Sequence, residues 1–196
     1  MASIRKVTVG LVSPISAGKG TVIEFLRNQG FFCSSLSDRI REEINSRGEE
    51  ITRERLLTVA DQLRQDFGPD VLAQRTWQIA LGHDNPRVAI DSIRGIAEVE
   101  FFKNKPGFYL IGITASRKMR FAWARKRARE GEPLTWEEFV RVDEQDFFSQ
   151  DGKVGRNIPA CLEKSDFLIE NDGTIDDLHR KAANILEQIF TDGQGS

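Results

Sequence analysis

Short apolar runs rich in β-branched residues recur along the 196-residue chain and are separated by amphipathic stretches. Five of these runs predict strands, at 7–12, 31–37, 87–91, 108–116 and 166–171. They are apolar on both faces, which is typical of strands buried in a parallel sheet rather than strands of a half-solvated antiparallel sheet. The pattern therefore predicts a sheet that is covered on both sides.

The stretches between these runs carry helix signals. Apolar residues recur at helical spacing in 52–67, where Gly68 is positioned to end a helix, and again in 69–81 behind a helix-opening proline. Thr174 is positioned to cap a last amphipathic helix. Strands that alternate with helices predict a three-layer α/β architecture with a five-stranded parallel sheet. We expect a single domain over 1–196.

Charge and composition act mainly by excluding classes of function. The formal net charge is −2 with 30% charged residues, so the chain carries no global field for nucleic acid or a membrane surface. No apolar run approaches the roughly 20 residues that span a bilayer. The first residues lead directly into a strand without a signal-peptide core, so we expect a cytoplasmic protein whose Cys33 and Cys161 are reduced thiols. Small molecules are the expected partners, nucleic acid is not, and a homodimer is left open.

The stretch SPISAGKGT, residues 13–21, directly follows the first apolar run. Small side chains let successive backbone N–H groups approach phosphate oxygens, and the N-terminus of the following helix adds a partial positive charge. Lys19 can reach the β- and γ-phosphates of a nucleoside triphosphate as a point charge. Strand, small-residue loop, Gly-Lys-Gly-Thr and helix together predict a phosphate-binding loop; a tight turn with a surface lysine is the alternative.

This loop resembles that of nucleoside monophosphate kinases of the adenylate kinase type, which carry Gly-Lys-Gly-Thr at this point. The likeness covers nearly the whole chain. Through SDRIREE, DSIRGIAEVEFF, WEEFVRVDEQD and DFLIENDGT it is closer still to archaeal and bacterial P-loop proteins similar to adenylate and dephospho-coenzyme A kinases. It implies a P-loop nucleotide kinase that uses ATP and Mg²⁺. The donor-binding residues that it implies are Ser16, Ala17, Gly18, Lys19, Gly20, Thr21 and, in the turn beside the adenine, Gly173. Ser13, Ile15 and Ser16 depart from the family's glycine- and proline-rich loop.

The resemblance also implies residues for the metal and the acceptor. Because the loop lysine is followed by glycine rather than a hydroxyl, we expect Mg²⁺ to be held mainly by phosphates and water, with Asp91 orienting that water. Asp38 and Arg41 match the family's Asp-x-x-Arg, which makes Arg41 the arginine for the acceptor phosphate. Arg94, in DSIRG, matches the second such arginine. The segment 38–86 would then be a helical acceptor-binding insertion; solvated or ion-paired arginines are the alternative.

A strongly basic helix is predicted over 117–129, with seven basic residues and no acidic one. Phosphoryl transfer requires that charge on the moving group be offset, and a mobile arginine-bearing cover does this while excluding water. In the resembling family such arginines lie on this helix and on the lid beyond it, which places the lid region at 117–160. Arg120, Arg125 and Arg127 are the candidate catalytic arginines, and a solvated basic face is the alternative.

Together these features predict an ATP-dependent phosphotransferase. Its expected acceptor is small and carries a phosphate, most simply a nucleoside or deoxynucleoside monophosphate. One alternative is a dephospho-coenzyme A kinase, in which Asp38 would be the base that activates a hydroxyl. Another is a nucleotide-binding regulatory ATPase without small-molecule kinase activity.

Overall fold

Aliphatic and β-branched side chains form five parallel strands, which make one sheet in the order β2-β3-β1-β4-β5. The computed structural model describes residues 6–127, 135–148 and 155–192. The strands are β1 (Val7–Val12), β2 (Phe32–Ser35), β3 (Arg87–Asp91), β4 (Phe108–Thr114) and β5 (Phe167–Glu170). The helices are α1 (Lys19–Asn28), α2 (Leu36–Ser46), α3 (Arg53–Phe67), α4 (Val71–Leu81), α5 (Ile96–Lys103), α6 (Arg117–Arg127), α7 (Trp136–Phe147), α8 (Ile158–Glu163) and α9 (Ile175–Asp192). The predicted α/β class with a five-stranded parallel sheet is confirmed.

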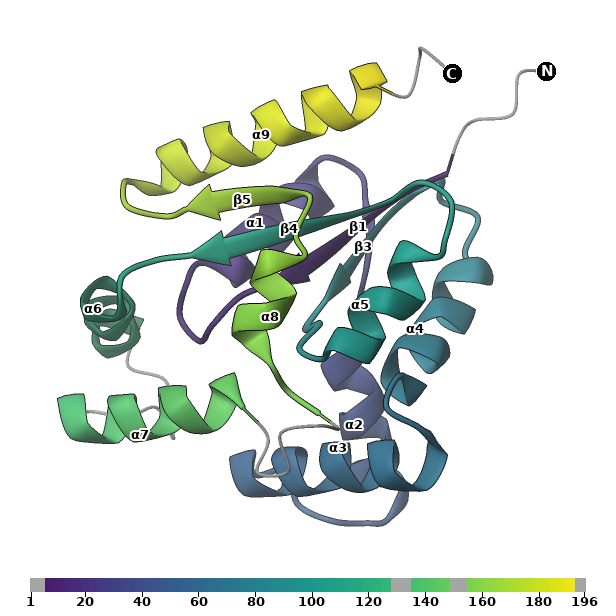
Figure 1. Cartoon of the computed structure of the whole chain (residues 1–196), viewed down its shortest axis with the longest axis vertical. Coiled ribbons are helices and arrows are strands. Elements are labelled where there is room, and N and C mark those ends of the chain that lie inside the picture. The colour runs from purple at the N-terminus through teal and green to yellow at the C-terminus, as the bar shows by residue number, and fades with distance from the viewer. Residues whose placement is uncertain (1–5, 128–134, 149–154, 193–196) are drawn as a thin grey trace.

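Helices cover both faces of the sheet, as Figure 1 shows. In β1, Val7, Val9 and Leu11 pack into one apolar cluster with residues of α1 and α9. On the other face, Val12 joins a second cluster built with α2, α3, α4, α5 and α8. Because every residue of β1 is buried, the strand reads as a continuous apolar run rather than an alternating one.

The second, fourth and fifth predicted strands are shorter in the structure, at Phe32–Ser35, Phe108–Thr114 and Phe167–Glu170. The second strand ends at Ser35, because the Ser35 hydroxyl accepts a hydrogen bond from the Ser37 amide (3.3 Å) and caps α2. Leu36 continues the apolar run in the sequence, but it is buried as the first residue of that helix. The fourth strand ends at Thr114. Gly68 does end α3, with a φ of 104° that favours glycine.

The strand order places a crevice beside the end of β1. β1 pairs with β3 on one side and with β4 on the other, so the connections that leave β1 and β3 diverge at their carboxyl ends. Ligands of open parallel sheets bind at such a switch point. The expected helical region at 38–86 consists of α2, α3 and α4, whereas parts of the expected lid at 117–160 lie outside the described residues. Within the described ranges, no helix is both long and apolar enough to cross a membrane.

Candidate functional site

The glycine-containing loop after β1 is held in place by Asn171, the residue that directly follows β5. Gly18 has a φ of 103°, and a Cβ there would lie 2.5 Å from Nδ2 of Asn171. That amide group donates a hydrogen bond to the carbonyl oxygen of Ala17 (3.0 Å). Gly18 is the N-cap of α1 and makes no side-chain cap hydrogen bond. The first amides of α1 therefore begin a helix without a capping side chain, which is the arrangement that favours binding of a phosphate.

A cavity of about 1040 Å³ opens over this loop and brings most of the predicted site residues together. Those that line it are Ser16, Ala17, Gly18, Lys19, Gly20, Thr21, Asp38, Arg41, Asp91, Arg94 and Arg127. Its volume lies at the upper end of the range of about 300–1,000 Å³ that is typical of ligand pockets. Residues from α1, α2, α6, α7 and α9 contribute to the same wall.

Lys19 forms an ion pair with Asp91, the last residue of β3. The same Oδ1 of Asp91 accepts a hydrogen bond from the Ser92 amide, and Ser92 adopts a φ of 65°, unusual for a residue other than glycine. The Ser92 hydroxyl also accepts a hydrogen bond from the Ser35 hydroxyl (3.2 Å). Backbone strain of this kind persists where surrounding contacts impose it and gathers at functional sites. Here the contacts of Ser92 hold the Asp91 carboxylate directly beside Lys19.

The residues around the loop fit a nucleotide with Mg²⁺. Proteins usually bind Mg²⁺ through one or two carboxylates together with substrate phosphates and water, and Asp91 offers one carboxylate at the cavity wall. Among the described residues, no group of three or more His, Cys, Asp or Glu side chains could hold a metal by itself. A Cβ at Gly20 would meet no atom within 4 Å, so this position leaves space beside the loop.

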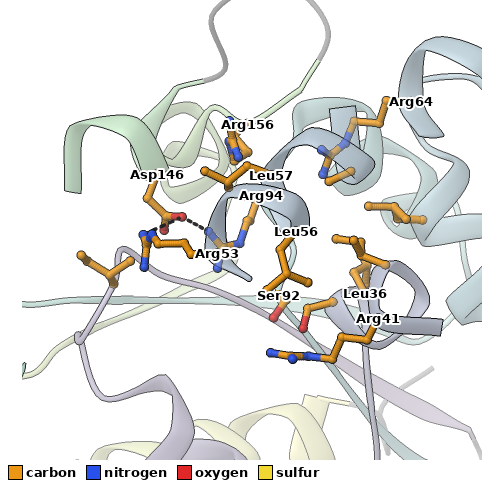
Figure 2. A pocket seen from close by; sticks show the side chains of 15 residues that line it. Leu36, Arg41, Arg53, Leu56, Leu57, Arg64, Ser92, Arg94, Asp146 and Arg156 are labelled. Atoms are coloured by element: carbon orange, nitrogen blue, oxygen red, sulfur yellow. Dashed lines mark hydrogen bonds and ion pairs between the residues drawn. The ribbon is translucent and has the colours of Figure 1, made fainter. Parts of the chain in front are cut away.

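Arginines gather on the side of the cavity away from α1. Arg94 pairs with Asp146, which also lies 3.8 Å from Nη2 of Arg53 (Figure 2). Burial alone would lower the pKa of Arg94, but the charge of Asp146 and its hydrogen bond outweigh burial and raise that pKa. Arg41 lines the same region from α2. These side chains offer several guanidinium donors to an anionic group.

The three candidate arginines of the basic helix have different environments. Arg127 lines the cavity and donates from Nη2 to the Ser16 hydroxyl (3.1 Å). Arg120 is buried and does not line the cavity; it binds Asp143 and the carbonyl oxygen of Ile15.

Two further predicted residues also lie outside the cavity wall. Arg125 is exposed, with its guanidinium carbon 5.8 Å from the centre of the Phe121 ring. Gly173 lies in the turn between β5 and α9, where a Cβ would meet the side chain of Asp177. The structure thus brings the loop and the predicted acceptor residues together but does not bring Arg120, Arg125 and Gly173 to the cavity.

Several residues of the site were not predicted from the sequence. Arg53 follows the N-cap Thr52 directly, and this position gives no signal of a role in the cavity. Asp146 stands three residues after Asp143 on α7, so the two acids share a helix face, and that spacing was an available signal. Both are almost fully buried, with exposed fractions of 3% and 0%.

Solved structures of kinases share this fold. A shikimate kinase from Bacteroides thetaiotaomicron superposes with a TM-score of 0.57 at 12% identity, covering 92% of this chain and 98% of that one. A gluconokinase from Sinorhizobium meliloti gives a TM-score of 0.53 at 12% identity, covering 97% and 98%. A shikimate kinase from Acinetobacter baumannii, in complex with shikimate, gives 0.56 at 16% identity, covering 95% and 94%. The chain is therefore an α/β protein with a P-loop kinase-like fold.

Similarity in sequence identifies the family more narrowly. A UPF0200 protein of Methanothermobacter thermautotrophicus is 31% identical over 194 residues, which are 98% of this chain and 96% of that protein. A UPF0200 protein of Pyrococcus horikoshii is 30% identical over 186 residues, 92% of this chain and 96% of that protein. The chain belongs to the UPF0200 family. No protein-family model matches it.

Proposed function

We propose that this protein is an ATP- and Mg²⁺-dependent phosphotransferase whose acceptor is a nucleoside or deoxynucleoside monophosphate. One observation carries the proposal: a single cavity joins the loop and Lys19 to Arg41 and Arg94. A cradle for a donor polyphosphate and guanidinium groups for an acceptor phosphate therefore face the same space. The similarity to kinase structures supports the class of reaction, and the arginines support the acceptor's charge.

In this proposal the reaction depends on positioning rather than on a general base, because a phosphate acceptor is already a nucleophile. The amides at the start of α1 and Lys19 hold the donor phosphates. Arg41 and Arg94 hold the acceptor phosphate in line with them, and Asp91 orients the water of the metal. The metal, when bound, supplies positive charge that offsets the charge of the phosphates. Arg127, which reaches the loop at Ser16, adds positive charge over the donor.

A coupled assay of ADP formation tests the proposal. ATP and Mg²⁺ are incubated with a panel of ribonucleoside and deoxyribonucleoside monophosphates, and acceptor-dependent ADP formation is expected for at least one of them. Arg41→Gln should raise the acceptor KM at least about tenfold with little change in the KM for ATP, since it removes a charged hydrogen-bond donor. Arg180→Gln, at a side chain that is 68% exposed on α9, is the control and should leave both unchanged. Absence of acceptor-dependent ADP at millimolar substrate would contradict the proposal, and hydrolysis insensitive to every acceptor would favour a regulatory ATPase.

A second candidate is phosphoryl transfer to a hydroxyl, as in a dephospho-coenzyme A kinase. Asp38 lines the cavity together with Arg41 and Lys19, so a carboxylate is available to accept a proton there. The structural neighbours include kinases named for shikimate, which supports considering this class. Asp38→Asn separates the two candidates. If Asp38 is a general base, the variant should lose at least about 100-fold in kcat while ATP binding is retained. If the acceptor is a phosphate, the loss in kcat should be much smaller.

A further inference from the structure

A small side pocket of about 160 Å³ opens from the cavity between α2 and α3. The two hollows share Ile15, Ser37, Arg41, Arg53, Ser92 and Arg94, so a molecule held at the shared arginines can extend into the pocket. Apolar side chains form much of its wall: Leu36, Ile40, Leu56, Leu57, Ala60 and Leu72. Charged side chains complete the lining: Arg41, Arg53, Arg64, Arg94, Asp146 and Arg156. Arg156 and Arg41 lie on opposite sides of the view in Figure 2. The pocket thus combines an apolar wall with a group of charged side chains.

Arg156, one of these charged side chains, is buried with most of its hydrogen-bond donors unused. Its side chain is 6% exposed, and among the described residues its Nε and Nη1 have no hydrogen-bond partner. Its Nη2 forms an ion pair with Oδ2 of Asp61 at 3.5 Å. Burial lowers the pKa of Arg156, and the charge of Asp61 only partly opposes this effect. A buried guanidinium normally has its N–H groups bonded, so these donors call for an acceptor group.

Two of the nearby acids, Glu98 and Asp61, are already committed to other groups. Oε1 of Glu98 accepts from Arg64, and its Oε2 accepts from the amides of Arg94 (2.9 Å) and Gly95 (3.0 Å). Asp61 is shared between Arg64 and Arg156. Asp146 lines the same pocket, and among the described residues its buried Oδ2 has no hydrogen-bond partner, so it does not bond Arg156 either. The carboxylates in the described ranges therefore leave Nε and Nη1 of Arg156 unsatisfied.

The size of the pocket limits what it can hold. An apolar protein cavity of about 150 Å³ takes a single benzene ring. A slot of about 160 Å³ therefore fits one six-membered ring, while the fused second ring of a purine exceeds it. Leucine and isoleucine walls suit the faces of such a ring, and the donors of Arg156 suit an oxygen at its edge.

We propose, on the basis of the function proposed above, that this side pocket holds the base of the acceptor and selects a pyrimidine over a purine. The acceptor phosphate lies at Arg41 and Arg94, and the base lies between the apolar side chains. A ring carbonyl oxygen of the base accepts a hydrogen bond from Arg156. Size excludes purines, and Arg156 orients the pyrimidine.

Binding is measured by titration calorimetry without ATP, so that it does not depend on turnover. UMP, CMP and dTMP should bind at least about tenfold more tightly than AMP and GMP. Arg156→Gln should weaken the binding of UMP at least about tenfold, the loss expected for one charged hydrogen bond. It should leave the binding of inorganic phosphate unchanged. Arg180→Gln is the matched control and should bind every ligand as the wild type does.

A second variant tests the size of the pocket without touching Arg156. Leu57 is half-buried, so Leu57→Ala should fold, and it should widen the slot and bring AMP to within about threefold of UMP. Purine monophosphates that bind the wild type as tightly as pyrimidines would overturn the proposal. Equal UMP affinity in the wild type and Arg156→Gln would overturn it too.

The two proposals fail in different ways. If UMP binds with the expected dependence on Arg156 but no acceptor supports ADP formation, the pocket assignment stands and the phosphotransferase falls. If AMP or GMP is the best acceptor in the ADP assay, the phosphotransferase stands and the pocket assignment falls.

Discussion

Replacing Arg120 with methionine separates a structural role for this arginine from a catalytic one. Its side chain is 4% exposed and that of Asp143 is 0% exposed, and Nη2 of Arg120 lies 2.9 Å from Oδ2 of Asp143. Arg120 also donates to the carbonyl oxygens of Ala115 and Ile15, each at 3.1 Å. It therefore ties α6, α7 and the phosphate-binding loop together.

The expected loss of stability follows from the charge of Asp143, which stays buried when Arg120 is removed. Removal of one partner of a buried ion pair costs about 3–5 kcal/mol, because the other charge stays buried. Arg117, which is 38% exposed, keeps one hydrogen bond to Asp143 (2.9 Å), so we expect the lower end, about 3 kcal/mol. With a urea m-value of about 3 kcal/mol/M, the unfolding midpoint should fall by about 1 M.

Urea unfolding followed by circular dichroism measures this loss, and a double variant checks its cause. Arg120→Met with Asp143→Leu replaces the buried pair by apolar groups, which is often nearly neutral, so most of the lost stability should return. If Arg120→Met instead unfolds within about 0.5 kcal/mol of the wild type while ATP turnover collapses, the structural reasoning is refuted. Arg120 would then act on the transferred group, as its place in the basic helix first indicated.

Three further experiments test other parts of the structure. Lys19→Met should weaken ATP binding at least about tenfold by calorimetry, with a small effect on stability because its ion pair is partly exposed. Gly107→Ala should lower the Tm by about 4 °C or more, since its φ is 71° and a Cβ would collide with a main-chain oxygen. Gly30→Ala should lower the Tm less, because its φ is 82° but the space around a Cβ is open. Burial raises the pKa of Cys33 and raises that of Cys161 to about 12. A raised pKa leaves less thiolate at a given pH, so iodoacetamide at about pH 8 should label both thiols slowly, with Cys33 reacting before Cys161. A more alkaline buffer should increase the labelling rate of Cys33.

The sheet and the loop were predictable because local chemistry determines them. The run VTVGLV at 7–12 carries apolar side chains on both faces of the strand, so it requires burial on both faces, whatever the helices do. Gly18 is required by its positive φ and by the approach of Asn171, and the strand-loop-helix pattern is enough to indicate such a position. These features therefore need no knowledge of distant contacts.

The roles of the arginines were less predictable because their partners lie far away along the chain. Arg94 pairs with an aspartate 52 positions later, and Arg120 with one 23 positions later. The sequence shows seven basic residues on one helix but does not show which of them a carboxylate from α7 will bury. Burial of Arg156, which pairs weakly with Asp61 on α3, likewise depends on tertiary packing.

Helix α7 connects the donor and acceptor sides of the cavity through two acids on one face. Asp143 binds Arg120, which holds the loop at the Ile15 carbonyl oxygen, whereas Asp146 binds Arg94. An acceptor phosphate that draws Arg94 toward itself must compete with Asp146, so binding at the acceptor side exchanges one anion for another at the same guanidinium. Because Asp143 lies one helical turn away, a shift of α7 that frees Arg94 also moves the partner of Arg120. In the proposed function, binding at the acceptor side is therefore linked to the position of the phosphate-binding loop through Asp143 and Asp146.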